Sequence, residues 1–124
     1  MEFIQTDKAP IPAGHYSQAV VHNGTIYVAG QLPIAPGQTE FKVGTIGEQT
    51  EQVMKNLQAI LRAAGSDLDK LLSVTIYVSD ISLWGEVNAT YVRMMGSHKP
   101  ARAVVPVKDL HYGYQIELSA IAAR

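Results

Sequence analysis

One amphipathic segment between residues 45 and 65 constrains the fold of this 124-residue chain more than any other feature. Thr45 precedes Glu48 by three residues, which is the spacing of a capping box at a helix start. Gly65 is suited to end the helix. The apolar positions between these signals recur with helical spacing and predict a single face: Ile46, Thr50, Val53, Leu57, Ile60, Leu61 and Ala64. Such a face has to be buried against another layer of structure.

Short β-rich runs lie on both sides of this helix. We predict strands at 17–22 and 25–29, joined at Asn23-Gly24, a dipeptide that favours positive φ at both turn positions. Residues 31–44 carry two prolines and two glycines and are predicted to form a long loop. Alternation over 72–79 predicts a strand with one apolar face: Leu72, Val74, Ile76 and Val78.

The C-terminal half adds a second helix and two more strands. The helix is predicted over 83–96, with Trp84, Val87, Tyr91, Met94 and Met95 along one stripe. The strands are predicted near 101–108 and 114–123. The predicted order is therefore ββαβαββ in one α+β domain spanning residues 1–124, with two helices on one face of a mixed sheet.

The other face of this sheet has no predicted helix to cover it. It would carry Ala103, Val105 and Val107, or Val104 with its neighbours, depending on the phase of the strand. Self-association of the open faces is the simplest way to bury these side chains.

Composition excludes several classes of function. The formal net charge of −1 argues against general nucleic-acid affinity, which usually needs a basic face. Cysteine is absent, which excludes disulfides and thiolate nucleophiles and fits a reducing compartment. We see neither a secretory signal nor an apolar run of membrane-spanning length, so we expect a cytoplasmic protein.

The familiar catalytic motifs are also missing. No serine lies in a G-x-S-x-G turn, and no glycines form the phosphate-binding G-x-G-x-x-G pattern. No histidine pair has H-x-x-x-H or H-E-x-x-H spacing, so we expect no metal site.

Two isolated charges remain as candidates for chemistry. Arg102 is the only charged residue in 100–106, and Glu117 is the only one in 115–121. We expect them on neighbouring strands of the sheet, where they can be a structural ion pair, or edge charges that discourage aggregation. Alternatively, the two residues can line a ligand pocket. The guanidinium of Arg102 could bind a carboxylate through two parallel hydrogen bonds, and the carboxylate of Glu117 could position a water.

The sequence resembles the RidA family, also called YjgF-type and, in an older name, endoribonuclease L-PSP. The resemblance covers essentially the whole chain and depends on the order and spacing of several short segments. These are residues 9–10, 14–19, 29–33, 49–57, 64–65, 87–88 with Tyr91, 100–102, and 116–117 with 120–122.

The resemblance implies a chorismate-mutase-like fold in a barrel-like homotrimer, with the helices outside and a pocket at each subunit interface. It implies hydrolysis of 2-imino acids or their enamine tautomers (2-aminoacrylate and 2-iminobutanoate type) to 2-keto acids and ammonia, without metal or cofactor. The expected ligand is thus a small 2-imino or 2-keto carboxylic acid.

The resemblance also implies a role for particular residues. Arg102 matches the arginine that binds the substrate carboxylate, and Glu117 matches the glutamate that orients the attacking water. Tyr16 matches a tyrosine from the adjoining subunit. Four more positions match the substrate-binding site: Ala29, Gly30, Asn88 and Val104, the last through its backbone carbonyl.

Some positions depart from the common family pattern. Ala29 stands where serine is frequent, Val104 where cysteine is frequent, and His15 where proline is common. Pro106 replaces a frequent acidic residue and, as a strand proline, indicates an edge or a bulge. Residues 110–114 replace the usual Leu-Pro stretch. These changes leave the choice of substrate open.

Three alternatives to a general imine deaminase stay open at this point. One is a non-catalytic module that binds small carboxylates in the same pocket. Another is a pathway-specific deaminase of the 2-aminomuconate type. The third is the ribonuclease or translation-inhibitor activity of the older family name, against which the near-neutral charge and the lack of a histidine pair argue.

Overall fold

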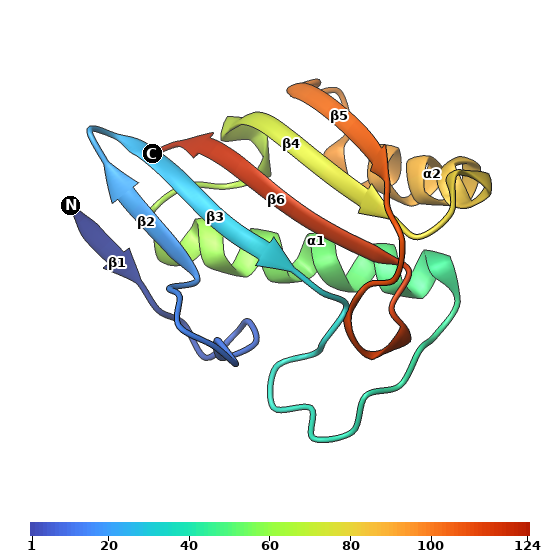
Figure 1. Cartoon of the computed structure of the whole chain (residues 1–124). Coiled ribbons are helices and arrows are strands. Elements are labelled where there is room, and N and C mark those ends of the chain that lie inside the picture. The colour runs from blue at the N-terminus through green and yellow to red at the C-terminus, as the bar shows by residue number, and fades with distance from the viewer.

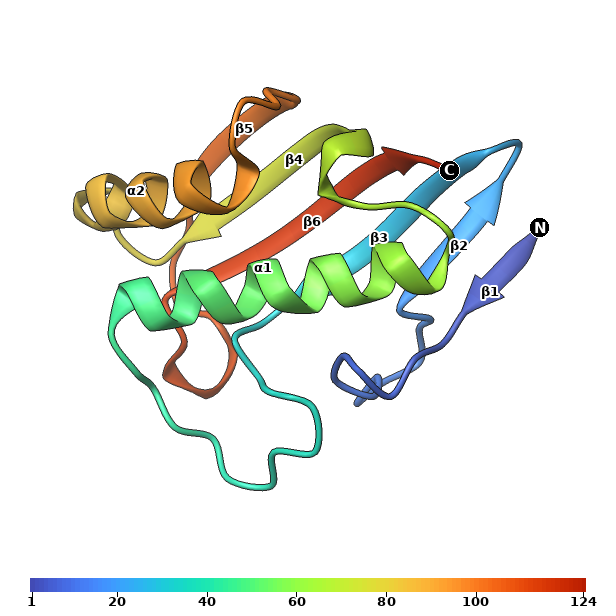
Figure 2. The ribbon, with the colours of Figure 1, turned by 180° about the vertical axis from the view of Figure 1, so that it is seen from behind.

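A six-stranded mixed sheet with two helices on one face forms the protein, and the computed structural model describes residues 1–124 (Figures 1 and 2). The strands are β1 (Glu2–Ile4), β2 (Ala19–His22), β3 (Thr25–Gln31), β4 (Leu71–Val78), β5 (Ala101–Pro106) and β6 (Ile116–Ala123). The helices are α1 (Ile46–Ala63) and α2 (Trp84–Met95), with short 3-10 turns η1 (Leu68–Lys70), η2 (Ile81–Leu83) and η3 (His111–Gly113). The strand order is β1-β2-β3-β6-β4-β5, and only the β4–β5 pair is parallel.

The α+β class is confirmed, but two details of the predicted order are wrong. The structure adds an N-terminal edge strand, β1, which pairs with β2. Its three residues are too few to show an alternating pattern, and only Ile4 is buried. Leu72 was predicted to face the core, yet it is 50% exposed while Leu71 is buried. The register of β4 against β6 shifts between Leu71 and Ser73, which reverses the face of the first residues of the strand.

The predicted local signals at the turn and at the helix start are confirmed. Asn23 and Gly24 both have positive φ, 51° and 75°, and close the β2–β3 hairpin. At the start of α1, the Glu48 amide donates to Thr45 Oγ1 and the Thr45 amide donates to Glu48 Oε1. These hydrogen bonds lower the pKa of the Glu48 carboxyl, because they favour its charged form.

The core lies between the helices and the inward face of the sheet. The predicted stripe of α1 is buried there together with side chains of β4 and β6, among them Ile76, Ile116 and Leu118. Val104 packs against this core, whereas its neighbours Ala103 and Val105 are exposed, which decides the phase of β5. Neither helix has both the length and the apolar character needed to cross a membrane.

The outward face of the sheet carries no helix, as Figure 1 shows. Its side chains form a row across paired strands, in which Phe3 pairs with Val20, Val20 with Tyr27, and Tyr27 with Ile121. Phe3 and Tyr27 are exposed. This open apolar face agrees with the expectation that the chain needs a partner to cover it.

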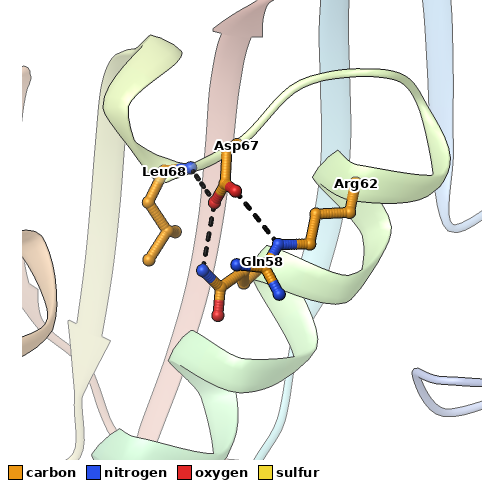
Figure 3. Close-up of polar contacts among 4 residues, drawn as sticks. All are labelled: Gln58, Arg62, Asp67 and Leu68. Carbon is orange, nitrogen blue, oxygen red and sulfur yellow. Dashed lines mark hydrogen bonds and ion pairs between the residues drawn. The ribbon is translucent and has the colours of Figure 1, made fainter.

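The segment that leaves α1 is held by Asp67 (Figure 3). Its carboxylate accepts hydrogen bonds from the Leu68 amide (2.7 Å), the Gln58 amide (3.0 Å) and the Arg62 guanidinium (3.0 Å). The bond from Gln58 is the largest cause of the lowered pKa of Asp67, followed by the bond from Leu68. Asp67 thus joins the end of the helix to the turn that begins β4.

Candidate active site

Arg102 lies on the edge strand β5 and points to the helix side of the sheet. Its register partner on β4 is the buried Val74, and its Nη1 donates a hydrogen bond to Asn88 Oδ1 of α2 at 3.0 Å. The guanidinium carbon is 4.6 Å from the ring centroid of Trp84 and 4.9 Å from that of Tyr91. Both distances are typical of cation–π contacts, so an amide and two rings orient the guanidinium.

The surroundings of Arg102 favour an anion. None of the five ion pairs in the structure involves Arg102, so Arg102 and Glu117 form no structural ion pair within the chain. A cavity of about 370 Å³ adjoins it and is also lined by Asn88, His98 and Lys99. The guanidinium therefore has donors available for an external carboxylate.

The Tyr91 ring packs beneath the Arg102 guanidinium. It is only 5% exposed, and its hydroxyl has no hydrogen-bond partner. Burial raises the pKa of the Tyr91 hydroxyl, and the positive charge of Arg102 acts in the opposite direction. The hydroxyl therefore stays neutral beside the cation at physiological pH.

Glu117 lies on the other face of the sheet. It follows the buried Ile116 and precedes the buried Leu118 on β6, and it pairs with Tyr77 of β4. Its carboxylate packs against Gly30 so closely that a Cβ on residue 30 would collide with Glu117 Oε2. The β3–β6 register shifts between Val28 and Gln31, so β3 carries an extra residue there. This bulge, which contains Ala29 and Gly30, makes the space for the carboxylate.

Tyr16 shares a larger cavity with Gly30. The cavity has a volume of about 460 Å³ and is formed by the loops before β2, after β3 and between β5 and β6. Buried Gln18 holds the first loop, because its Nε2 donates to the carbonyls of Thr6 and Pro10 and its Oε1 accepts from the Thr6 amide. Tyr16 itself is exposed at the cavity edge.

Two buried amide side chains of α1 hold the other loops, and no role was predicted for them from the sequence. Asn56 Nδ2 donates to the carbonyls of Leu32 and Ile34, which fixes the chain after β3. Gln49 donates to the Gly44 carbonyl and exchanges hydrogen bonds with Gln115, the residue before β6. The available signal was an amide at each of these positions beside the apolar stripe of the helix.

The predicted site residues thus form two separate groups within one chain. Arg102 and Asn88 are together on the helix side, while Glu117, Gly30, Ala29 and Tyr16 are grouped around the bulge and the loop cavity. The expectation that Glu117 lies on the strand next to Arg102 is wrong, because β4 separates β5 from β6. Val104 lies two residues beyond Arg102, with its side chain against the core. Pro106 is the last residue of β5, and the edge position that a strand proline predicts is confirmed.

Comparison with known proteins identifies the family. The model of the endoribonuclease L-PSP family matches residues 6–124. A RutC family protein of Pyrococcus abyssi is 44% identical over 121 residues, which is 98% of this chain and 95% of the relative. A rat protein named 2-iminobutanoate/2-iminopropanoate deaminase is 40% identical over 121 residues, covering 98% of this chain and 88% of that protein.

Solved structures agree. The crystal structure of RidA from a Psychrobacter species superimposes with a TM-score of 0.94 at 37% identity and covers 100% of both chains. That of E. coli TdcF with bound serine has a TM-score of 0.94 at 28% identity, covering 100% of this chain and 99% of TdcF. This chain belongs to the endoribonuclease L-PSP family, which includes the RidA proteins.

Proposed function

We propose that this protein hydrolyses 2-imino acids, or their enamine tautomers, to 2-keto acids and ammonia. The observation that carries the proposal is the state of Arg102. Its guanidinium is oriented by Asn88, Trp84 and Tyr91 and has no acidic partner, which suits it to grip a substrate carboxylate. The name of the rat relative and the serine bound to TdcF support a small amino-acid-like ligand.

The chemistry requires little from the protein beyond positioning. An imine carbon is already electrophilic, so a single water held by the Glu117 carboxylate is a sufficient nucleophile. The water oxygen bonds to C2, its protons move to the nitrogen, and the C2–N bond breaks to release ammonia. The carbonyl oxygen of the keto acid comes from the water, and no oxidant or reductant takes part.

The other matched residues complete the proposed pocket. Asn88 holds Arg102, and the bulge at Ala29 and Gly30 receives Glu117. The Val104 backbone carbonyl accepts a hydrogen bond from the imine nitrogen. Tyr16 closes the side of the pocket next to Gly30.

We further propose that the working enzyme is a homotrimer. Arg102 and Glu117 point to opposite faces of one sheet with β4 between their strands, so one chain cannot place both against one small substrate. Packing the open sheet face of one chain against the edge strand β5 of a neighbouring chain would bury the apolar row and bring Glu117 of the first chain to Arg102 of the second. The pocket then lies at the subunit interface.

A coupled assay tests the activity. An amino-acid oxidase or dehydratase generates the imine, and keto-acid release is followed with and without the protein. We expect release faster than in buffer alone. If the rate stays that of buffer while calorimetry detects 2-oxobutanoate binding, the protein is a binding module and not a deaminase.

Arg102→Lys tests the role of the arginine. Lysine keeps the charge but cannot make the bidentate contact, so we expect kcat/KM to fall by roughly 100- to 10,000-fold. Arg93→Lys, at an exposed position of α2, serves as the matched control. Unchanged activity in Arg102→Lys, with the assembly intact, would rule out the carboxylate contact.

A further inference from the structure

An aromatic wall stands in the loop cavity beside the proposed reaction centre. The rings of Phe41, in the loop after β3, and Tyr112, in η3, are stacked with centroids 3.8 Å apart and planes within 2°. Both residues line the cavity that contains Gly30 and Tyr16, and both remain about half exposed, at 49% and 47%. The stack is therefore a cavity surface and not part of the core.

The backbone at Tyr112 is in an unfavourable conformation. Its φ is 63°, in the left-handed region that bulky side chains rarely adopt, and Gly113 follows with φ 79°. A side chain held in such a conformation at a cavity wall is a common feature of ligand sites. The rings of Tyr112 and Tyr114 form a T-shaped pair with centroids 6.3 Å apart, so Tyr114 supports the Tyr112 ring.

The lining of the cavity indicates the kind of group that it can hold. It has no aspartate, glutamate, lysine or arginine, and half of its sixteen residues are hydrophobic. Ile11 and Ile34 join the two rings among its apolar residues. Apart from His111, no side chain of the lining could pair with a charged group, so the cavity favours an uncharged and mostly apolar occupant.

The size of the cavity exceeds what a small imino acid needs. Its volume of about 460 Å³ is in the range of sites that enclose whole small-molecule ligands. The cavity reaches Gly30, which is in contact with the carboxylate of Glu117. A substrate whose C2 atom lies at Glu117 can therefore extend its side chain into this space.

We propose that this cavity binds the side chain of the substrate and that the preferred substrates are 2-imino acids with an aromatic side chain, such as the imine of phenylalanine. This inference rests on the proposed function for the position of the reacting carbon. The flat face presented by Phe41 and Tyr112 suits an aromatic ring, which gains contact by offset or edge-to-face packing.

Binding of stable keto acids tests the cavity independently of turnover. Calorimetry compares phenylpyruvate with 2-oxobutanoate, which share the 2-keto acid group but differ in the side chain. We expect phenylpyruvate to bind at least about tenfold more tightly, the order that a filled apolar pocket contributes. Equal or weaker binding of phenylpyruvate overturns the proposal.

Substitutions in the aromatic wall test whether it causes the preference for phenylpyruvate. Phe41→Ala and Tyr112→Ala should each reduce the preference for phenylpyruvate over 2-oxobutanoate severalfold. Because both rings are half exposed and outside the core, the variants should keep the fold. Tyr112→Phe keeps the ring and should keep the preference. Ile81→Ala, which removes an exposed apolar side chain that does not line the cavity, is the control. Loss of affinity for both keto acids alike would also contradict the proposal.

The two proposals fail in different ways. Rapid hydrolysis of 2-iminobutanoate without preferential binding of phenylpyruvate leaves the deaminase activity standing and removes the aromatic preference. Preferential binding of phenylpyruvate without hydrolysis of either imine leaves the cavity assignment standing and removes the deaminase activity.

Discussion

At the scale of single residues, position 30 is decided by the space that Glu117 occupies. Gly30 is exposed to solvent, and the residues next to it in the sequence do not explain why a glycine is needed there. The reason is the Glu117 carboxylate, which fills the place of a Cβ. The bulge in β3 and the missing side chain together set the direction of the carboxylate.

Gly30→Ala should therefore impair catalysis more than folding. The added methyl group pushes the Glu117 carboxylate aside, and a displacement of about 1 Å in a catalytic group can lower the rate roughly 100-fold. Steady-state kinetics measure kcat/KM, and urea denaturation checks that the fold is kept. Gly85→Ala is the matched control, because a Cβ there meets no atom within 4 Å. Wild-type kcat/KM in Gly30→Ala would show that the position of Glu117 does not matter.

At the scale of elements, Asp67 links α1 to β4 (Figure 3). Three donors converge on its carboxylate, from the Gln58 and Arg62 side chains and the Leu68 backbone. Since the Asp67 side chain is 39% exposed, solvent screens its charge, and the hydrogen bonds from Gln58 and Leu68 matter more than the ion pair with Arg62.

Asp67→Ala should lower the free energy of unfolding by about 1 kcal/mol at neutral pH, the usual cost of losing a capping side chain. The folded-state pKa of Asp67 lies below the unfolded value of about 3.9. Its stabilisation is thus complete above that value and is lost as the pH falls through the folded pKa. Denaturation of wild type and variant should differ at about pH 7 and converge toward about pH 2. Asp69→Ala, an exposed neighbour in η1, is the control, and a difference that does not depend on pH would contradict the role of the charge.

The elements themselves follow well from the sequence because their signals are local. The capping box at Thr45 and the turn at Asn23-Gly24 depend on atoms a few residues apart, and the structure contains both. Predictions that depended on pairing between distant strands were less successful. Leu72 was assigned to the wrong face because a register shift, which only the partner strand β6 defines, interrupts the alternation.

At the scale of the whole molecule, the division of the site between two faces predicts complementation between variants. Arg102→Ala and Glu117→Gln should each be inactive alone. Mixed trimers, made by co-expression or by unfolding and refolding together, should recover about one quarter of wild-type activity, because one interface in about four joins an intact Arg102 to an intact Glu117. Kinetics on the mixture measure this recovery, and a mixture of Arg102→Ala with wild type calibrates it.

No recovery in the mixture, with trimers formed, would mean that both residues act from the same chain. That outcome would contradict the arrangement in which β4 separates them. Sedimentation of the purified protein gives the oligomeric state independently, and a stable monomer with full activity would remove the interface site altogether.

The sequence by itself determined the helices, the hairpin and the α+β class. It also marked Arg102 as the only charged residue of an apolar strand. Each of these features depends on neighbouring residues. Only the tertiary structure decided that β4 lies between Arg102 and Glu117, that Glu117 packs on Gly30, and that Phe41 meets Tyr112 across 71 residues of chain. These contacts depend on strand order and register, which are set by the sum of many non-local packing energies. A shift of one residue in that register would turn either charge to the opposite face of the sheet.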